Sequence, residues 1–122
     1  MAAYYLAVDI GASSGRHILG HMENGKMVLE EIYRFENGMV KKDGELCWEF
    51  DRLFQEIKNG LKKCKEIGKI PVSMGVDTWG VDFVLLDKDD KVLGNTVGYR
   101  DHRTEGMDEE VYKTISLKDL YA

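Results

Sequence analysis

The sequence predicts an α/β fold in which an antiparallel meander of three strands comes first, followed by a helix and by a strand that returns beside the first one. Apolar runs over 4–9, 16–23 and 27–36 alternate with short turns of small and polar residues, as neighbouring antiparallel strands do. A helical pattern over 51–67 and a buried-strand pattern over 72–78 follow. This order opens a ribonuclease-H-like α/β fold, which needs further α/β units to cover both faces of its sheet.

The turns between these strands contain the residues that tight turns require. ENGK at 23–26 favours a type I′ hairpin turn, because asparagine and glycine both accept a positive φ. KKDGE at 41–45 predicts another turn, with a short strand over 46–50 beside it.

The predicted helix depends on apolar residues spaced three or four apart, which form one face of an amphipathic helix. Those residues are Leu53, Phe54, Ile57, Leu61, Cys64 and Ile67. Asp51 is the expected N-cap, and Gly68 is the expected glycine just beyond the last turn.

Beyond the helix, the pattern predicts three further strands and a mostly polar end. The strands cover 72–78, 81–87 and 92–97, with the turn KDDK between the last two. YRDHRT at 99–104 is expected to be a polar loop, and 106–121 has a weak helical pattern.

Composition and charge restrict the classes of function. Hydrophobic residues make up 43% and charged residues 32% of the 122 residues, which is typical of one globular domain. The net charge of −5 argues against a nucleic-acid partner, which would require a basic face. No apolar run reaches the roughly 18 residues of a membrane span, and residues 1–10 lack a signal-peptide pattern. Cys47 and Cys64 lack metal-ligand spacing, so they indicate free thiols in a reducing compartment, the cytoplasm.

The stretch AVDIGASSGRHIL at 7–19 is the first pattern with chemical meaning. An apolar strand ends on Asp9, a turn of small residues follows, and Arg16 begins the next strand. The backbone N–H groups of such a tip attract phosphate, serines add hydroxyl donors, and arginine adds a planar fork of donors. Asp9 is placed to hold Mg²⁺ through water. The alternative is a plain hairpin turn, in which glycine and serine serve the backbone alone.

A second pattern, GVDTWGVDFVLLD at 75–87, favours a sugar. Asp77 and Asp82 flank a tryptophan and a glycine between two predicted strands. An aromatic ring can stack on a sugar while hydroxyl and carboxylate groups hold its hydroxyls. In the alternative interpretation, Trp79 belongs to the core and the two aspartates are caps.

The third pattern is YRDHRT at 99–104, where two arginines and an aspartate crowd together. Such a run is typical of a loop held by its own salt bridges. In the alternative interpretation an arginine of this loop, Arg103, reaches the substrate.

These segments together resemble the FGGY carbohydrate kinases, a family within the actin/hexokinase/Hsp70-like superfamily of ATPases. AVDIGASSGR matches the first phosphate segment of the family. RFENG at 34–38, the region of Trp48, VDTWGVDFVLLD at 76–87 and GYRDHRT at 98–104 follow in the order and spacing of the members that act on L-rhamnulose. DTWGVDFVLLD separates this chain from the members that act on glycerol, xylulose or gluconate. The resemblance covers essentially the whole chain.

The resemblance implies that residues 1–122 are the first part of the N-terminal, sugar-binding domain of a kinase, with the rest of the enzyme outside this chain. The reaction would be transfer of the γ-phosphoryl group of ATP to the 1-hydroxyl of L-rhamnulose, with Mg²⁺ as the metal ion. By position, Asp9 would organise the Mg²⁺, and the ATP-phosphate segment would be Ala12, Ser13, Ser14, Gly15 and Arg16. The sugar pocket would contain Gly80, Trp79, Asp82 and Arg103.

The resemblance also implies that parts of the machinery lie beyond residue 122. The catalytic base of the family is an aspartate in a later segment, and the adenine site is in a second domain. We therefore expect no phosphorylation by these residues alone, and neither Asp77 nor Asp82 is assigned as the base. The uncovered sheet edge and apolar surface of such a piece predict self-association.

Two alternatives belong to other classes of protein. A ribonuclease-H-like nuclease would use Asp9 and Asp77 as ligands of two metal ions. An actin-like or Hsp70-like module would bind a nucleotide without catalysis. The acidic net charge, Arg16 at the hairpin tip and the DTWGVDF segment argue against the nuclease. The DTWGVDF segment gives no reason for a module that only binds a nucleotide.

Overall fold

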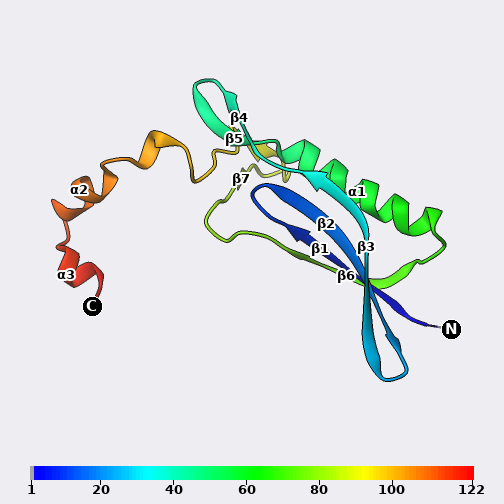
Figure 1. Cartoon of the computed structure of the whole chain (residues 1–122). Helices are drawn as coiled ribbons and strands as arrows, with labels where there is room; N and C mark the ends of the chain where they lie inside the picture. The colour runs from blue at the N-terminus through cyan, green and yellow to red at the C-terminus, as the bar shows by residue number, and fades with distance from the viewer. Residues whose placement is uncertain (1) are drawn as a thin grey trace.

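A four-stranded mixed sheet with one long helix against it forms the centre of the molecule (Figure 1). The computed structural model describes residues 2–122. The four strands are β1 (Tyr4–Ile10), β2 (Ser14–Glu23), β3 (Lys26–Glu36) and β6 (Pro71–Asp77). They lie in the order β3-β2-β1-β6, which confirms the predicted meander and the strand that returns beside the first one.

The register of these strands fixes which loops are neighbours. β1 pairs antiparallel with β2 and parallel with β6, so β1 and β6 end at the same edge of the sheet. Asp9 lies opposite Arg16 on one side and opposite Asp77 on the other. The β1–β2 tip and the segment that follows β6 therefore leave the sheet side by side.

Two hairpins turn through residues with positive φ. Asn24 and Gly25 have φ of 49° and 75°, as the predicted type I′ turn between β2 and β3 requires. Asp43 and Gly44 have φ of 52° and 80° and join β4 (Met39–Lys42) to β5 (Glu45–Trp48). The sequence predicts this second turn and a strand after it but not β4, whose residues are mostly exposed and lack an alternating pattern.

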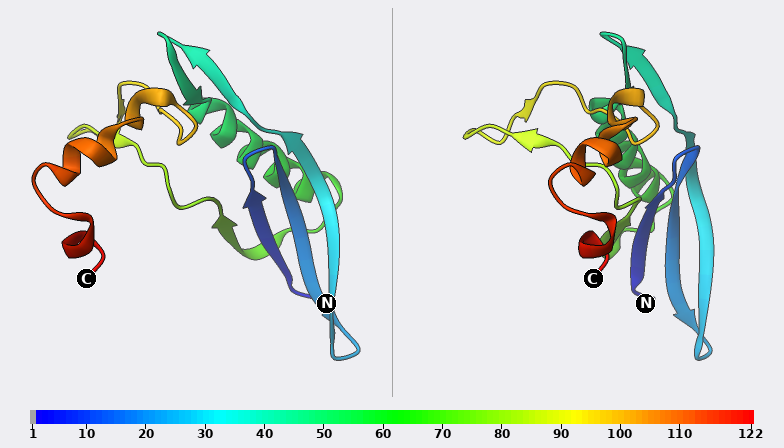
Figure 2. Two further views of the ribbon diagram at one scale, coloured as in Figure 1. Left: turned by 60° about the vertical axis from the view of Figure 1, so that its left-hand side comes forward. Right: turned by 90° about the vertical axis from the view of Figure 1, so that its left-hand side faces the viewer.

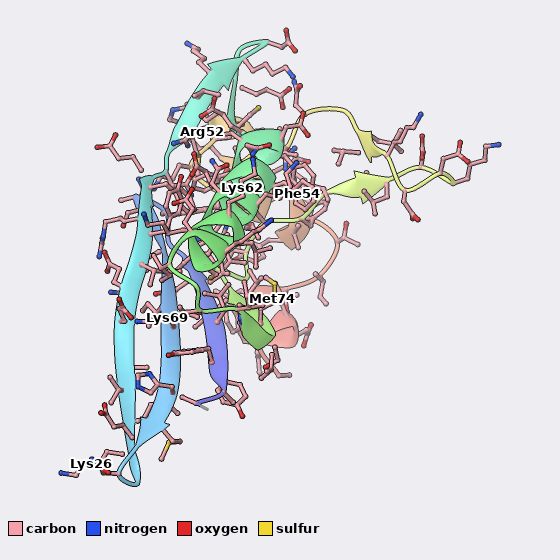
Figure 3. All side chains as sticks on the ribbon, turned by 90° about the vertical axis from the view of Figure 1, so that its right-hand side faces the viewer. Lys26, Arg52, Phe54, Lys62, Lys69 and Met74 are labelled. Atoms are coloured by element: carbon pink, nitrogen blue, oxygen red, sulfur yellow. The ribbon has the colours of Figure 1, made fainter. Side chains whose placement is uncertain are left out.

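Helix α1 (Phe50–Glu66) packs against the sheet with most of the predicted face, namely Leu53, Ile57, Leu61 and Cys64. Phe54 and Ile67, which the prediction also placed on this face, are exposed. The predicted N-cap is wrong, because the cap position is Glu49 and Asp51 lies in the first turn, where its charge favours the helix dipole. The predicted end is confirmed, since Gly68 follows the C-cap with a φ of 70°. Lys69, just beyond the helix, forms an ion pair with Glu30 on β3 and so ties the helix end to the sheet (Figure 3).

The core lies between α1 and one face of the sheet. Side chains alternate along a strand, so Leu6, Val8 and Ile10 of β1 all point to the helix, and each is at most 5% exposed. Leu19, Phe35 and Cys64 complete this buried cluster. Both cysteines are free and buried, and burial raises the pKa of each thiol.

His17 on β2 is fully buried beneath the helix. Its Nε2 lies 3.3 Å from the carbonyl oxygen of Ile57, and its Nδ1 has no hydrogen-bond partner among the described residues. Burial lowers the pKa of His17, against a smaller opposing effect of the Ile57 carbonyl. The fold therefore favours the neutral ring.

The other face of the sheet has no covering layer within residues 2–122. Tyr5, Met27 and Leu29 lie on this face, and Leu29 is 67% exposed. On the helix side of the sheet, α1 does not reach the edge strand β6, so Met74 and Val76, which pair with Leu6 and Val8, are exposed as well (Figures 1 and 3). One layer of the expected fold is thus present, and the surface for a second layer is apolar.

The segment after β6 differs from the prediction. Of the strand predicted over 81–87, only β7 (Leu85–Leu86) forms, paired with β8 (Val92–Leu93) instead of the predicted 92–97. Val97 makes an isolated bridge to Cys47. Apolar residues in 81–86 resemble a strand, but no sheet edge lies beside residues 79–84, which run without regular structure.

The last part of the chain extends away from the sheet (Figure 2). Instead of one helix over 106–121, it forms η1 (His102–Thr104), α2 (Met107–Tyr112) and α3 (Leu117–Leu120), and no residue of these is buried. Ser116 caps α3 by accepting from the backbone N–H of Asp119, which starts a new helix where one continuous helix was predicted. Within residues 2–122, no helix is long and apolar enough to cross a membrane.

Candidate active site

The β1–β2 tip is held from outside by the segment after β3. The backbone N–H of Gly11 donates to the carbonyl of Ser14 at 2.9 Å and closes the turn. Asn37 donates its side-chain amide to the Gly11 carbonyl and its backbone N–H to the Ser13 carbonyl, both at 2.9 Å. Among the described residues, the backbone N–H groups of Ala12 and Ser13 have no acceptor. These donors suit an anion.

Asp9 and Arg16 form a partly exposed ion pair at the base of this tip. Arg16 Nε lies 3.1 Å from Asp9 Oδ2, and both side chains are more than 40% exposed. A pair so exposed contributes only about 0–1 kcal/mol to stability. Both groups can therefore exchange partners with a ligand at little cost to the fold.

A second arginine near the tip was missed by sequence reasoning. Arg34 lies opposite Arg16 in the β2–β3 register, and its Nη1 donates to Ser14 Oγ at 3.4 Å. Glu31 holds this guanidinium with two hydrogen bonds of 2.8 Å and raises the pKa of Arg34. The RFENG motif contains Arg34, but only strand pairing brings it to the tip.

The packing of the sheet gives its own reason for a glycine at position 15, which the sequence places in the expected phosphate segment. Gly15 is buried, and a Cβ added there would lie 2.1 Å from the Phe35 ring. The glycine therefore lets Phe35 pack across the sheet, whatever else the tip does.

Two tryptophans and one carboxylate define the segment after β6. Trp79 Nε1 donates to Asp82 Oδ2 at 2.9 Å, and Trp48 Nε1 donates to the same oxygen at 2.7 Å. The ring centroids of the two indoles are 4.2 Å apart. Trp79 also packs against the core, as one sequence interpretation has it, but Asp82 is not a helix cap. Sequence reasoning missed this role of Trp48.

Gly80 lies between the bonded side chains and is exposed. A Cβ built on it meets no atom within 4 Å, and its φ is not in the left-handed region. The local fold within the described residues therefore gives no reason for glycine at this position.

Arg103 and Asp82 line the same cavity of about 260 Å³, together with Tyr99. The expected salt bridges of the 99–104 loop do not form, because Asp101 accepts the backbone N–H groups of Leu46 and Arg103, both at 2.8 Å. These bonds lower the pKa of Asp101. The Arg103 guanidinium has no partner among the described residues.

The two candidate regions meet at one edge of the sheet. Asp9 and Arg16 project from the open face, whereas Trp79 packs on the side of α1. Asp77 ends β6 beside Asp9, and Thr78 then enters an apolar cavity of about 350 Å³ that Trp79 and Asp82 also line. A ligand that contacts both the β1–β2 tip and the Trp79 segment must therefore lie across the end of the sheet where β1 and β6 terminate.

Comparison with known proteins gives the family. The model of the N-terminal domain of the FGGY family of carbohydrate kinases matches residues 4–122. The chain belongs to this family. The nuclease alternative is not favoured.

Individual relatives agree with this assignment. The chain is 59% identical over 118 residues to the rhamnulokinase of Halalkalibacterium halodurans and 53% identical over 116 residues to that of Oceanobacillus iheyensis. These alignments cover 97% and 95% of this chain, which spans about a quarter of the length of either relative, 25% in each case.

Two solved structures share the fold. A gluconate kinase from Lactobacillus acidophilus superposes with a TM-score of 0.78 at 15% identity, covering 99% of this chain and 24% of that one. A ligand-bound xylulose kinase from the same organism gives 0.76 at 16% identity, with coverages of 98% and 24%. The predicted fold of the actin/hexokinase type is confirmed.

Proposed function

We propose that this chain is the first part of the sugar-binding domain of a kinase that transfers the γ-phosphoryl group of ATP to the 1-hydroxyl of L-rhamnulose. The observation that carries the proposal is the shared edge of β1 and β6, where an anion-binding tip and a tryptophan–glycine segment lie side by side. High identity to two rhamnulokinases over nearly the whole chain supports the choice of sugar.

The tip would bind the phosphates of ATP through Ala12, Ser13, Ser14, Gly15 and Arg16. Unpaired backbone donors, serine hydroxyls and a guanidinium together match phosphate oxygens. Phosphoryl transfer asks the protein mainly to position groups and neutralise charge, and this segment supplies both.

Asp9 would hold Mg²⁺. Its side chain is 42% exposed, the residue pairs with Asp77 in the β1–β6 register, and Arg16 is its single side-chain partner among the described residues. A cation that prefers oxygen ligands fits there. When bound, the ion would offset negative charge on the phosphates.

The sugar would lie against Trp79 and the open backbone at Gly80, with Asp82 and Arg103 nearby. The proton of the sugar hydroxyl needs a base, and that base would come from a segment beyond this chain. The 122 residues alone would therefore be inactive.

A coupled assay of ADP release with L-rhamnulose and Mg·ATP tests the proposal. It would be run on this chain and on a protein of the relatives' full length that contains it. We expect turnover by the long protein only. Turnover by the short chain would contradict the location of the base, and turnover of a different ketose only would contradict the choice of sugar.

Gly80→Ala should impair sugar use without affecting the fold. A methyl group there meets nothing in the chain, so the melting temperature should change little, whereas a sugar close to the backbone would collide with it. We expect the KM for the sugar to rise at least tenfold. Gly38→Ala, also in open space without a positive φ, is the matched control. An unchanged KM would remove Gly80 from the pocket.

We also propose a cytoplasmic protein whose partners are a small sugar and a nucleotide, without nucleic acid or membrane. Alone, the 122-residue chain should self-associate through the open face that carries Tyr5, Met27 and Leu29. Sedimentation velocity would show a concentration-dependent mass, and Leu29→Lys should reduce it. A monomer at all concentrations would contradict this.

A further inference from the structure

Trp48 is firmly held next to the proposed sugar pocket. It ends β5, is 7% exposed, and exchanges two hydrogen bonds with Thr96. Its backbone N–H donates to the Thr96 carbonyl at 2.9 Å, and its carbonyl accepts from Thr96 Oγ1 at 2.5 Å. Trp48 is thus a fixed point next to a segment that lacks regular structure.

Residues 79–84 depend on that fixed point. Within residues 2–122, the bonds from Trp79 and Trp48 to Asp82 are the hydrogen bonds that this segment makes. Both indoles donate to Oδ2, whereas Oδ1 has no partner in the described chain. One carboxylate oxygen thereby joins the segment to β5 across 34 residues of sequence.

The same oxygen shapes the turn that contains Gly80. The bond from Trp79 to Asp82 links side chains three residues apart, so it draws residues 79–82 into a turn. Gly80 lies inside that turn with its backbone exposed. Loss of the acceptor would leave two indole N–H groups without a hydrogen bond, and each buried donor left unpaired costs free energy.

We infer that Asp82 is a positioning residue, which orients Trp79 and Gly80 by accepting hydrogen bonds from Trp48 and Trp79, and does not itself hold the sugar. The inference depends on the proposed function for the identity of the ligand. It assigns to Trp48 a part in the pocket, and it makes the geometry of 79–82 depend on one acceptor atom.

The variants Asp82→Asn and Asp82→Ala distinguish a positioning role of Asp82 from direct contact with the sugar. The amide oxygen of Asp82→Asn can accept from both indoles, but its NH₂ group cannot accept from a sugar hydroxyl as Oδ1 could. Asp82→Ala removes the acceptor altogether. In the full-length kinase we expect Asp82→Asn to stay within about threefold of the parent in sugar KM, and Asp82→Ala to raise it more than tenfold, with the KM for ATP unchanged in both.

Circular dichroism measures the relative placement of the two indole rings in the absence of substrate. Trp48 and Trp79 are the two tryptophans of this chain, and rings 4.2 Å apart couple as excitons. In the 122-residue chain, the exciton couplet should persist in Asp82→Asn and vanish in Asp82→Ala. Asp89→Ala, at an exposed aspartate, is the matched control for loss of a carboxylate.

Each outcome decides the inference. Equal loss of sugar affinity in Asp82→Asn and Asp82→Ala would mean that the carboxylate contacts the sugar. Loss of the couplet without a change in sugar KM, or retention of the couplet in Asp82→Ala, would also overturn it. If the parent kinase turns over no L-rhamnulose, the proposed function fails, while the dichroism still decides whether Asp82 holds the segment.

Discussion

Gly60→Ala is expected to destabilise the fold by about 3 kcal/mol, although alanine is the better helix former. A Cβ on Gly60 would lie 2.1 Å from Cδ2 and Nε2 of His17, and that ring is fully buried between α1 and β2. In an exposed helix the same change would stabilise by about 1 kcal/mol. The sign of the effect therefore reports the close approach of helix and strand.

Urea unfolding of the parent and of Gly60→Ala measures this difference. Gly38→Ala serves as the control because a methyl group there meets no atom. In the double variant with His17→Ala the collision is gone, so the two effects should be strongly non-additive. An equally stable or more stable Gly60→Ala would show that the helix lies further from β2.

The pH dependence of the parent is an independent measure of the same packing. Burial lowers the pKa of His17 in the folded chain, so the unfolded chain takes up the proton first as the pH falls. The neutral His17 ring makes its full contribution to the free energy of unfolding above the pKa of the unfolded chain, near 6.5. This contribution declines as the pH drops towards the lower pKa of the folded chain. Urea unfolding at a series of pH values should therefore show a loss of stability below pH 6.5 in the parent that His17→Gln lacks.

Arg16→Ala in the full-length kinase is expected to lower kcat by about 100-fold. Removal of one hydrogen-bond donor that stabilises charge in a transition state has an effect of this size. Arg16 lies beside Asp9 at the proposed phosphate tip, and the proposed sugar pocket is formed by a different segment. In Arg16→Ala, the KM for the sugar should therefore change by a much smaller factor than kcat. The exposed ion pair contributes about 0–1 kcal/mol, so the folded fraction should be unaffected.

Steady-state kinetics with both substrates varied would measure this split. Lys62→Ala, at an exposed side chain on α1, is the control for loss of one positive charge. Arg16→Lys should recover part of the activity, since lysine retains the charge but not the planar fork of donors. Unchanged turnover in Arg16→Ala would remove Arg16 from phosphate binding.

Local patterns were sufficient for the first half of the fold. Alternation defined β1, β2 and β3, and the Asn24–Gly25 pair defined the hairpin between β2 and β3. The helical period and Gly68 defined α1 and its end. These features depend on residues close in sequence, where period and backbone preference decide the structure.

Local patterns failed where apolar residues had no neighbouring strand. The run around Val81 alternates like a strand but lies at no sheet edge, and the end of the chain has helical propensity without a surface to pack on. Residues 79–84 follow their side-chain bonds instead, and the predicted helix over 106–121 divides at Ser116.

The sequence by itself determined the meander, the long helix, the small-residue tip between β1 and β2, and the tryptophan–glycine segment of this protein. Only the tertiary structure decided that Arg34 reaches Ser14 and that Trp48 and Trp79 share one oxygen of Asp82. The physical reason is distance along the chain. Strand register and a hydrogen bond across 34 residues arise from packing of the whole sheet and helix, which no local period specifies.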